Sequence, residues 1–176
     1  MTRYVALLGS INVGGNRLKM AELREALERE DFADVETVVA SGNVLFSHDE
    51  RPSDGLADKI AYVVKDRFGI DTFAAVRSRA ELAASIAGNP FTGQHEDKFV
   101  HTVFLQQPLD PVAFAAFVES YEGPERVSPG TREYFVDFHE SVADSKLGQA
   151  MRQLRLRGTA RNVRSLQRML DKMDSF

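Results

Sequence analysis

Short apolar runs typical of strands alternate with helical patterns along this chain, and the order of these patterns limits the folds that it can adopt. In the first half, β-type runs cover residues 4–8, 35–40, 44–46 and 72–76. Helical spacing covers residues 20–30, and a second helix follows an expected N-cap at Ser53 and stops at Gly69. The order β-α-β-β-α-β predicts a ferredoxin-like unit, in which the βαβ arrangement is split.

The second half repeats most of this order. After a short helix over 81–87 and a break at Asn89-Pro90-Phe91, strands are expected over 99–105, 125–127 and 134–138, and helices over 112–118, 147–156 and 162–173. The repeat lies in the pattern, since the two halves share no residue motif. We therefore predict an α+β fold of two ferredoxin-like units packed together, over residues 1–78 and 79–176, with an extra C-terminal helix.

Composition excludes several classes of protein. The chain of 176 residues has no cysteine, which excludes disulfides and thiolate chemistry. No apolar run approaches the roughly 18 residues of a membrane span, and the first residues read as a strand, so we expect a bacterial-type cytoplasmic protein without a membrane partner. The net charge of −4 does not favour nucleic-acid binding by the whole surface, although the C-terminal segment is locally basic.

The connection between the first strand and the first helix has an unusual composition. It holds three glycines, two asparagines, Arg17 and Lys19, where a plain turn needs one glycine and a cap. Glycines let backbone N–H groups approach a ligand closely, and the N-terminus of the following helix favours negative charge. This loop therefore predicts a site for an anion.

A second polar connection, at Ser41-Gly42-Asn43, is expected at the same end of the sheet, about 10 Å away with one strand between them. By the same logic, the segment 158–162 would be a connection at the equivalent edge of the second unit. The candidate ligand-binding residues are Asn12, Gly14, Gly15, Arg17, Lys19, Ser41, Asn43, Thr159, Arg161 and Asn162.

Purely structural roles explain the same residues. Gly14 and Gly15 also suit a tight turn, and Ser41-Gly42-Asn43 also suits a hairpin without a ligand. Asn162 is well placed to cap the last helix, and Arg164 and Arg168 suit a solvated helix face. The spacings of the standard dinucleotide and P-loop motifs are absent.

Motifs spread over nearly the whole chain resemble the bacterial family called domain of unknown function 1697. They are the segments 11–15, 19–20, 41–43, 89–91, 97–98, 145–147 and 159–162. The resemblance implies two ferredoxin-like halves and supplies no function. The family usually has Arg-Gly before Ile11, where this chain has Gly9 and Ser10, so a cation that could contact a ligand is missing.

Catalytic machinery is not evident. The four histidines, His48, His95, His101 and His139, read as structural or solvated, and His139-Glu140 lacks a third ligand at a suitable spacing for a metal. Ser145 precedes Lys146, but helix capping explains that serine better than nucleophilic catalysis does. Catalytic residues, cofactors and oligomeric state are therefore left unknown, with no metal expected.

Two functions remain open from the sequence. The first is binding of a small anionic or nucleotide-like ligand at the Gly/Asn/Arg-rich loop edge. The second is a nucleic-acid or protein interaction module that uses the basic C-terminal helix. RNA binding by the sheet is disfavoured because Phe99 and Phe104 fall on opposite faces of a regular strand.

Overall fold

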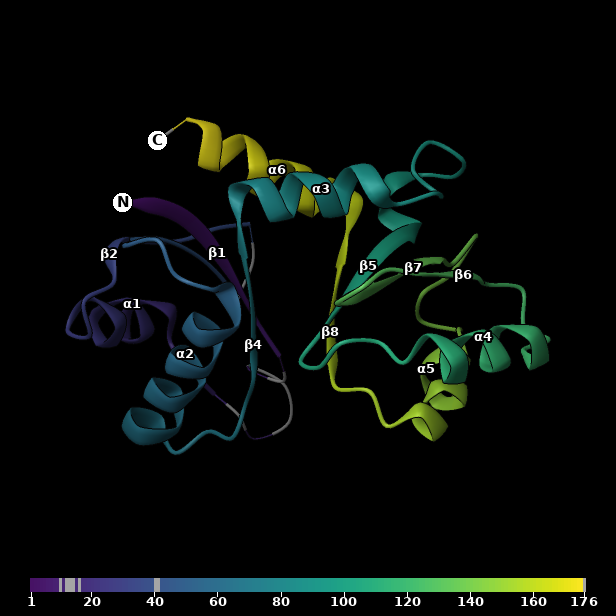
Figure 1. Cartoon of the computed structure of the whole chain (residues 1–176), viewed down its shortest axis with the longest axis horizontal. Coiled ribbons are helices and arrows are strands. Elements are labelled where there is room, and N and C mark those ends of the chain that lie inside the picture. The colour runs from purple at the N-terminus through teal and green to yellow at the C-terminus, as the bar shows by residue number, and fades with distance from the viewer. Residues whose placement is uncertain (10, 12–14, 16, 40–41, 176) are drawn as a thin grey trace. The chain divides into compact units, whose positions relative to one another are not determined.

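The computed structural model describes residues 1–9, 11, 15, 17–39 and 42–175, and the chain forms two compact units (Figure 1). Unit 1 comprises Met1–Ala83 and Arg168–Phe176, and unit 2 comprises Ala84–Gln167. The chain is therefore α+β in two parts. The expected boundary after residue 78 stays a prediction; packing assigns the end of the chain to unit 1.

Unit 1 is a four-stranded antiparallel sheet with two helices packed against it (Figure 1). The strand order is β2-β3-β1-β4, so β1 pairs with both β3 and β4. Its elements are β1 (Thr2–Leu8), α1 (Met20–Glu28), β2 (Ala33–Thr37), β3 (Asn43–His48), α2 (Ser53–Phe68), β4 (Ala74–Ser78) and the beginning of α3 (Arg79–Gly88).

The core of unit 1 follows from the helical spacing of α2. Leu56, Ile60, Val63 and Val64 lie on one face of this helix and are buried in the same cluster as Phe46. The helix ends at Gly69, whose φ of 67° places it in the left-handed region that glycine adopts without strain. The expected N-cap at Ser53 is wrong. Pro52 occupies that position, and the Ser53 hydroxyl donates to Glu81 instead.

Unit 2 has the same strand order, with β6-β7-β5-β8 again antiparallel. Its core is built from Phe114 and Phe117 of α4 together with strand residues such as Val136. Its elements are the end of α3, η1 (Asp97–Phe99), β5 (Val100–Leu105), α4 (Pro111–Ser120), β6 (Arg126–Pro129), β7 (Glu133–Asp137), α5 (Leu147–Ala150), η2 (Met151–Leu154), β8 (Gly158–Asn162) and most of the first turns of α6 (Val163–Asp174).

The prediction of a loop over 158–162 is wrong, because these residues form strand β8. Thr159 lies opposite Phe104, and Asn162 lies opposite His101. The expected helix over 147–156 is shorter than predicted and continues as the 3-10 turn η2. None of the described helices combines the length and the apolar character that a membrane crossing requires.

Candidate histidine–aspartate site

Asp137 is the last residue of β7 and the centre of a polar cluster in unit 2. Its side chain is 0% exposed. Cross-strand pairing sets it opposite Arg126, the first residue of β6, and the Arg126 guanidinium donates to Asp137 Oδ2 over 2.7 Å. The buried carboxylate is thus paired with a cation on the neighbouring strand. Such pairing offsets the free-energy cost of burying a charge.

His95 reaches the same carboxylate from the loop before η1. Its Nδ1 lies 2.6 Å from Asp137 Oδ2, and the His95 side chain is 36% exposed. Because an ionised carboxylate can only accept, Nδ1 of His95 carries the hydrogen. In the neutral ring this leaves the lone pair on Nε2, at the outer side of the imidazole.

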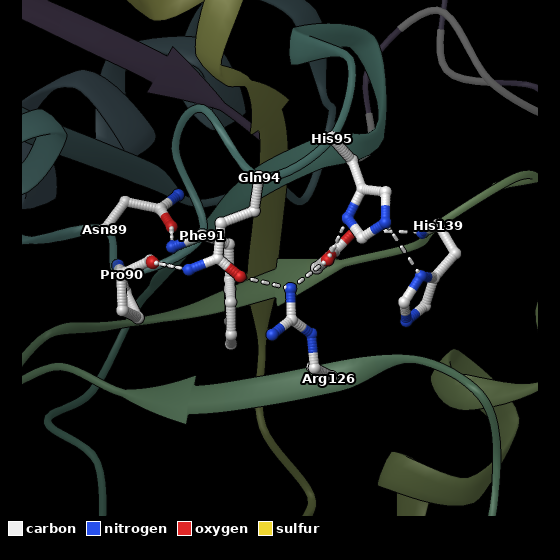
Figure 2. Close-up of polar contacts among 8 residues, drawn as sticks. Asn89, Pro90, Phe91, Gln94, His95, Arg126 and His139 are labelled. Atoms are coloured by element: carbon white, nitrogen blue, oxygen red, sulfur yellow. Dashed lines mark hydrogen bonds and ion pairs between the residues drawn. The ribbon is translucent and has the colours of Figure 1, made fainter.

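His139 completes the cluster, two residues after Asp137. Its backbone N–H donates to Asp137 Oδ1 over 3.0 Å, and its φ of 60° turns the chain there. The His139 Nδ1 lies 3.3 Å from His95 Nε2, with ring centroids 4.5 Å apart at an angle of 70°. Figure 2 shows the two imidazoles facing each other. The Asp137 carboxylate therefore contacts both histidines: Oδ2 holds the His95 imidazole, and Oδ1 holds the backbone N–H of His139.

The loop that carries His95 is held by a chain of hydrogen bonds (Figure 2). Asn89 Oδ1 accepts from the backbone N–H of Phe91 over 2.9 Å, and Gln94 Nε2 donates to the Pro90 carbonyl over 2.9 Å. Arg126 donates to Gln94 Oε1 over 2.5 Å, and its guanidinium carbon lies 4.9 Å from the centroid of the Phe91 ring. Arg126 thus fixes both Asp137 and the loop.

Electrostatics keep Asp137 ionised. Burial by itself raises the pKa of this carboxyl, but hydrogen bonds from Arg126, from the His139 backbone and from His95 outweigh burial. The net effect holds the pKa of Asp137 below its ordinary value. The carboxylate is therefore a permanent acceptor for His95 Nδ1 at neutral pH.

A cavity of about 510 Å³ lies beside His139, and Glu125 and Ser145 line it. Glu125 accepts from the Ser145 hydroxyl over 2.5 Å and from the Tyr121 hydroxyl over 2.5 Å. Burial, followed by the hydrogen bond and the charge of Glu125, raises the pKa of Tyr121 to about 12. Ser145 also accepts from the Leu147 N–H over 3.2 Å, but Lys146 occupies the N-cap position of α5, so the expected helix cap at Ser145 is wrong.

The anion-site residues of the first half are only partly described. Asn12, Gly14 and Ser41 lie outside the described residues. Gly15, Arg17 and Lys19 are exposed, whereas Asn43 is 2% exposed and lies opposite Leu7. The Leu8 N–H donates to the Gly42 carbonyl over 2.8 Å, so the end of β1 and the hairpin before β3 are direct neighbours, closer than predicted.

The candidates of the second half make structural contacts along β8. The Arg161 guanidinium donates to the Thr159 hydroxyl over 2.6 Å, and burial lowers the pKa of Arg161 to about 10. Asn162 Oδ1 accepts from the Ser165 N–H over 2.8 Å, which confirms Asn162 as the cap of α6. Arg164 and Arg168 are exposed on that helix.

Sequence reasoning missed the cluster around Asp137. It treated His95 as a surface residue and His139 as part of an incomplete metal-ligand set. Asp137, which links the two histidines, lies 42 residues from His95 in the chain. A usable signal was present, since Asp137 and His139 are two residues apart at the end of an expected strand. The Asn89-Pro90-Phe91 motif was noted, but its role in placing the His95 loop depends on contacts that the sequence does not reveal.

The fold and site together define a two-unit α+β protein with a histidine–aspartate cluster in its second unit. The chain belongs to the protein family of unknown function DUF1697, whose family model matches residues 1–135. Asp137 and His139 lie just beyond the matched range.

A solved structure with a similar fold is that of a conserved bacterial protein from Streptococcus pneumoniae. The two share 24% sequence identity, with a TM-score of 0.78 over 99% of each chain. This likeness extends to the fold alone. No curated protein matches the chain.

Proposed function

We propose that the protein binds a divalent transition-metal ion, of which Zn²⁺ is the type, through His95 and His139. The observation that carries the proposal is the distance of 3.3 Å between His95 Nε2 and His139 Nδ1. Two imidazole nitrogens bound to one tetrahedral Zn²⁺ at 2.0–2.1 Å lie about 3.3 to 3.4 Å apart. The two nitrogens thus have the spacing of two ligands on one metal ion. In the protein without metal, a hydrogen bond links these nitrogens.

Asp137 accepts a hydrogen bond from Nδ1 of His95, the ring nitrogen that would not bind the metal. A carboxylate on the far nitrogen of a metal-binding imidazole fixes its tautomer and raises its basicity. Carboxylate and imidazole atoms of His95, Asp137 and His139 lie within 4.8 Å of one another. However, Arg126 and His95 share Asp137 Oδ2, so we assign Asp137 the orienting role. Solvent or a substrate would occupy the other two positions of the tetrahedron, one more than in a catalytic zinc site with three protein ligands.

Calorimetric titration of the metal-free protein with Zn²⁺ tests this proposal. One ion should bind per chain, and His95→Ala or His139→Ala should abolish the heat of binding. Asp137→Asn should weaken binding by about 10- to 100-fold. The matched control is His48→Phe, which removes a histidine from unit 1 and should leave Zn²⁺ binding unchanged. Wild-type affinity in His95→Ala would contradict the proposal.

A second candidate function is binding of a small anionic or nucleotide-like ligand at the end of β1. The hydrogen bond from the Leu8 N–H to the Gly42 carbonyl favours it, because that bond makes the two polar connections neighbours. A thermal-shift screen of nucleotides and phosphorylated metabolites tests it. A hit should be lost in Arg17→Ala and in Asn43→Ala, and a hit that persists in both would reject this site.

We also infer that each unit is a ferredoxin-like split βαβ unit. Two observations support this. The chain order in each unit is strand, helix, strand, strand, helix, strand, and in both sheets the first strand in the chain pairs with the third and the fourth. The inference gives β8 the role in unit 2 that β4 has in unit 1.

A further inference from the structure

Unit 2 contains a small cavity of about 150 Å³, lined by residues of its sheet and of the segment that carries α5 and η2. An apolar cavity of about this volume holds one benzene-sized molecule. The lining residues are Val103, Leu105, Tyr134, Gly148, Met151, Arg152, Leu156 and Gly158. Val103, Leu105 and Met151 are buried in the core cluster of unit 2, so the cavity suits the apolar body of a small ligand.

The pairing of the strands builds one wall of this cavity. Val103 and Leu105 are two residues apart on β5, so their side chains lie on the same face of the sheet. Tyr134 of β7 lies opposite Val103, and Gly158 of β8 lies opposite Leu105. A Cβ added at Gly158 would lie 2.7 Å from Val103 Cγ1, so a larger residue there would collide with this wall.

The hydroxyl of Tyr134 is a hydrogen-bond donor that a ligand can reach. Tyr134 is partly buried, and its hydroxyl makes no hydrogen bond to the described residues. This oxygen is nevertheless not one of their fully buried polar atoms without a partner, so it keeps accessible surface. Burial raises the pKa of Tyr134 to about 12, so the hydroxyl stays protonated and can donate at neutral pH.

Arg152 supplies a positive charge at this cavity. It lies on η2, is exposed, and forms no ion pair or side-chain hydrogen bond with the described residues. None of the described residues that line the cavity carries a carboxylate. The segment 147–158 contains three arginines and no acidic residue, so the local charge favours an anion. A guanidinium can bind both oxygens of a carboxylate at once.

We propose that this cavity binds a small organic carboxylate with an apolar body of about six carbon atoms, aromatic or aliphatic. The body lies against Val103 and Leu105. Arg152 binds the carboxylate, and the Tyr134 hydroxyl donates to one of its oxygens. The site is separate from the histidine–aspartate cluster, because Tyr134 and Asp137 are three residues apart on β7 and fall on opposite faces of the sheet.

Thermal shift with sodium benzoate and with sodium hexanoate, each against sodium chloride of equal ionic strength, tests the proposal. At least one of them should raise the melting temperature, and the larger shift distinguishes an aromatic from an aliphatic body. Acetate lacks the body and benzamide lacks the charge, so both should give smaller shifts. An equal shift with acetate or with benzamide would overturn the proposal, as would the absence of a shift with both benzoate and hexanoate.

Two conservative variants locate the ligand, with the Kd taken from the dependence of the shift on ligand concentration. Arg152→Gln should raise the Kd about 10-fold, because the charge-assisted hydrogen bonds are lost. Tyr134→Phe keeps the ring but not the donor, and should raise the Kd about 3-fold. The matched controls, Arg164→Gln and Tyr62→Phe, alter exposed residues on α6 and α2 and should leave the Kd unchanged. An unchanged Kd in Arg152→Gln would place the ligand elsewhere and overturn the proposal.

Discussion

Asp137 Oδ2 and His95 Nδ1 lie 2.6 Å apart, although 42 residues separate them in the chain. The carboxylate is fully buried, whereas the imidazole reaches solvent. This pair joins the core of unit 2 to the surface where His139 lies, and it directs Nε2 of His95 toward His139 Nδ1.

The loss of Asp137 should destabilise unit 2. Asp137→Asn removes the negative charge that Arg126 and His95 share, and we expect the free energy of unfolding to fall by about 2 kcal/mol. Urea denaturation measures this change. Asp174→Asn, in the exposed pair with Arg79, is the matched control and should have a much smaller effect. Equal effects of the two substitutions would contradict the buried role of Asp137.

The contribution of Asp137 should depend on pH in a definite direction. Its pKa in the folded protein is below its ordinary value, because hydrogen bonds from Arg126, His139 and His95 outweigh the opposing effect of burial. A depressed pKa gives stability that is fully present above the unfolded pKa and is lost as the pH falls through the folded pKa. The difference in unfolding free energy between wild type and Asp137→Asn should therefore shrink below about pH 4.

Urea denaturation at a series of pH values checks this expectation. A difference that stays constant from neutral pH to about pH 3 would show that the pKa of Asp137 is not depressed.

Asn162 should act as a helix cap. Asn162→Ala removes the acceptor for the Ser165 N–H and should lower the free energy of unfolding by about 1 kcal/mol, whereas Asn162→Asp should retain the cap. Chemical denaturation of the three proteins provides the measurement. An unchanged free energy of unfolding in Asn162→Ala would show that the cap does not stabilise α6.

Gly9 should resist substitution for a packing reason. A Cβ at this position would collide with the ring of Phe73, which is buried, so Gly9→Ala should destabilise the protein by about 1 to 3 kcal/mol. Gly15→Ala is the control, since a Cβ there meets no atom of the described residues within 4 Å. Thermal denaturation compares the two, and a similar small change in both would mean that Phe73 moves aside easily.

The order of elements in unit 1 could be predicted because its signals are local. The spacing of Leu56, Ile60 and Val64 defines the buried face of α2 wherever that helix packs, and Gly69 ends the helix through its own backbone freedom. The cap at Asn162 was likewise predictable, since its partner Ser165 is three residues away. The sequence also predicted two polar connections at the end of β1, and Gly42 does lie beside Leu8.

By itself, then, the sequence determined the alternation of strands and helices in unit 1, the end of α2 at Gly69, the cap of α6 at Asn162 and the absence of thiol chemistry. Only the tertiary structure decided that residues 158–162 form a strand, because that strand exists through pairing with β5, far away in the chain. The same holds for the cluster of His95, Asp137 and His139. The spacing of apolar residues along the chain indicates which face of a helix or strand is buried. The distances between side chains from remote segments depend on how those segments pack.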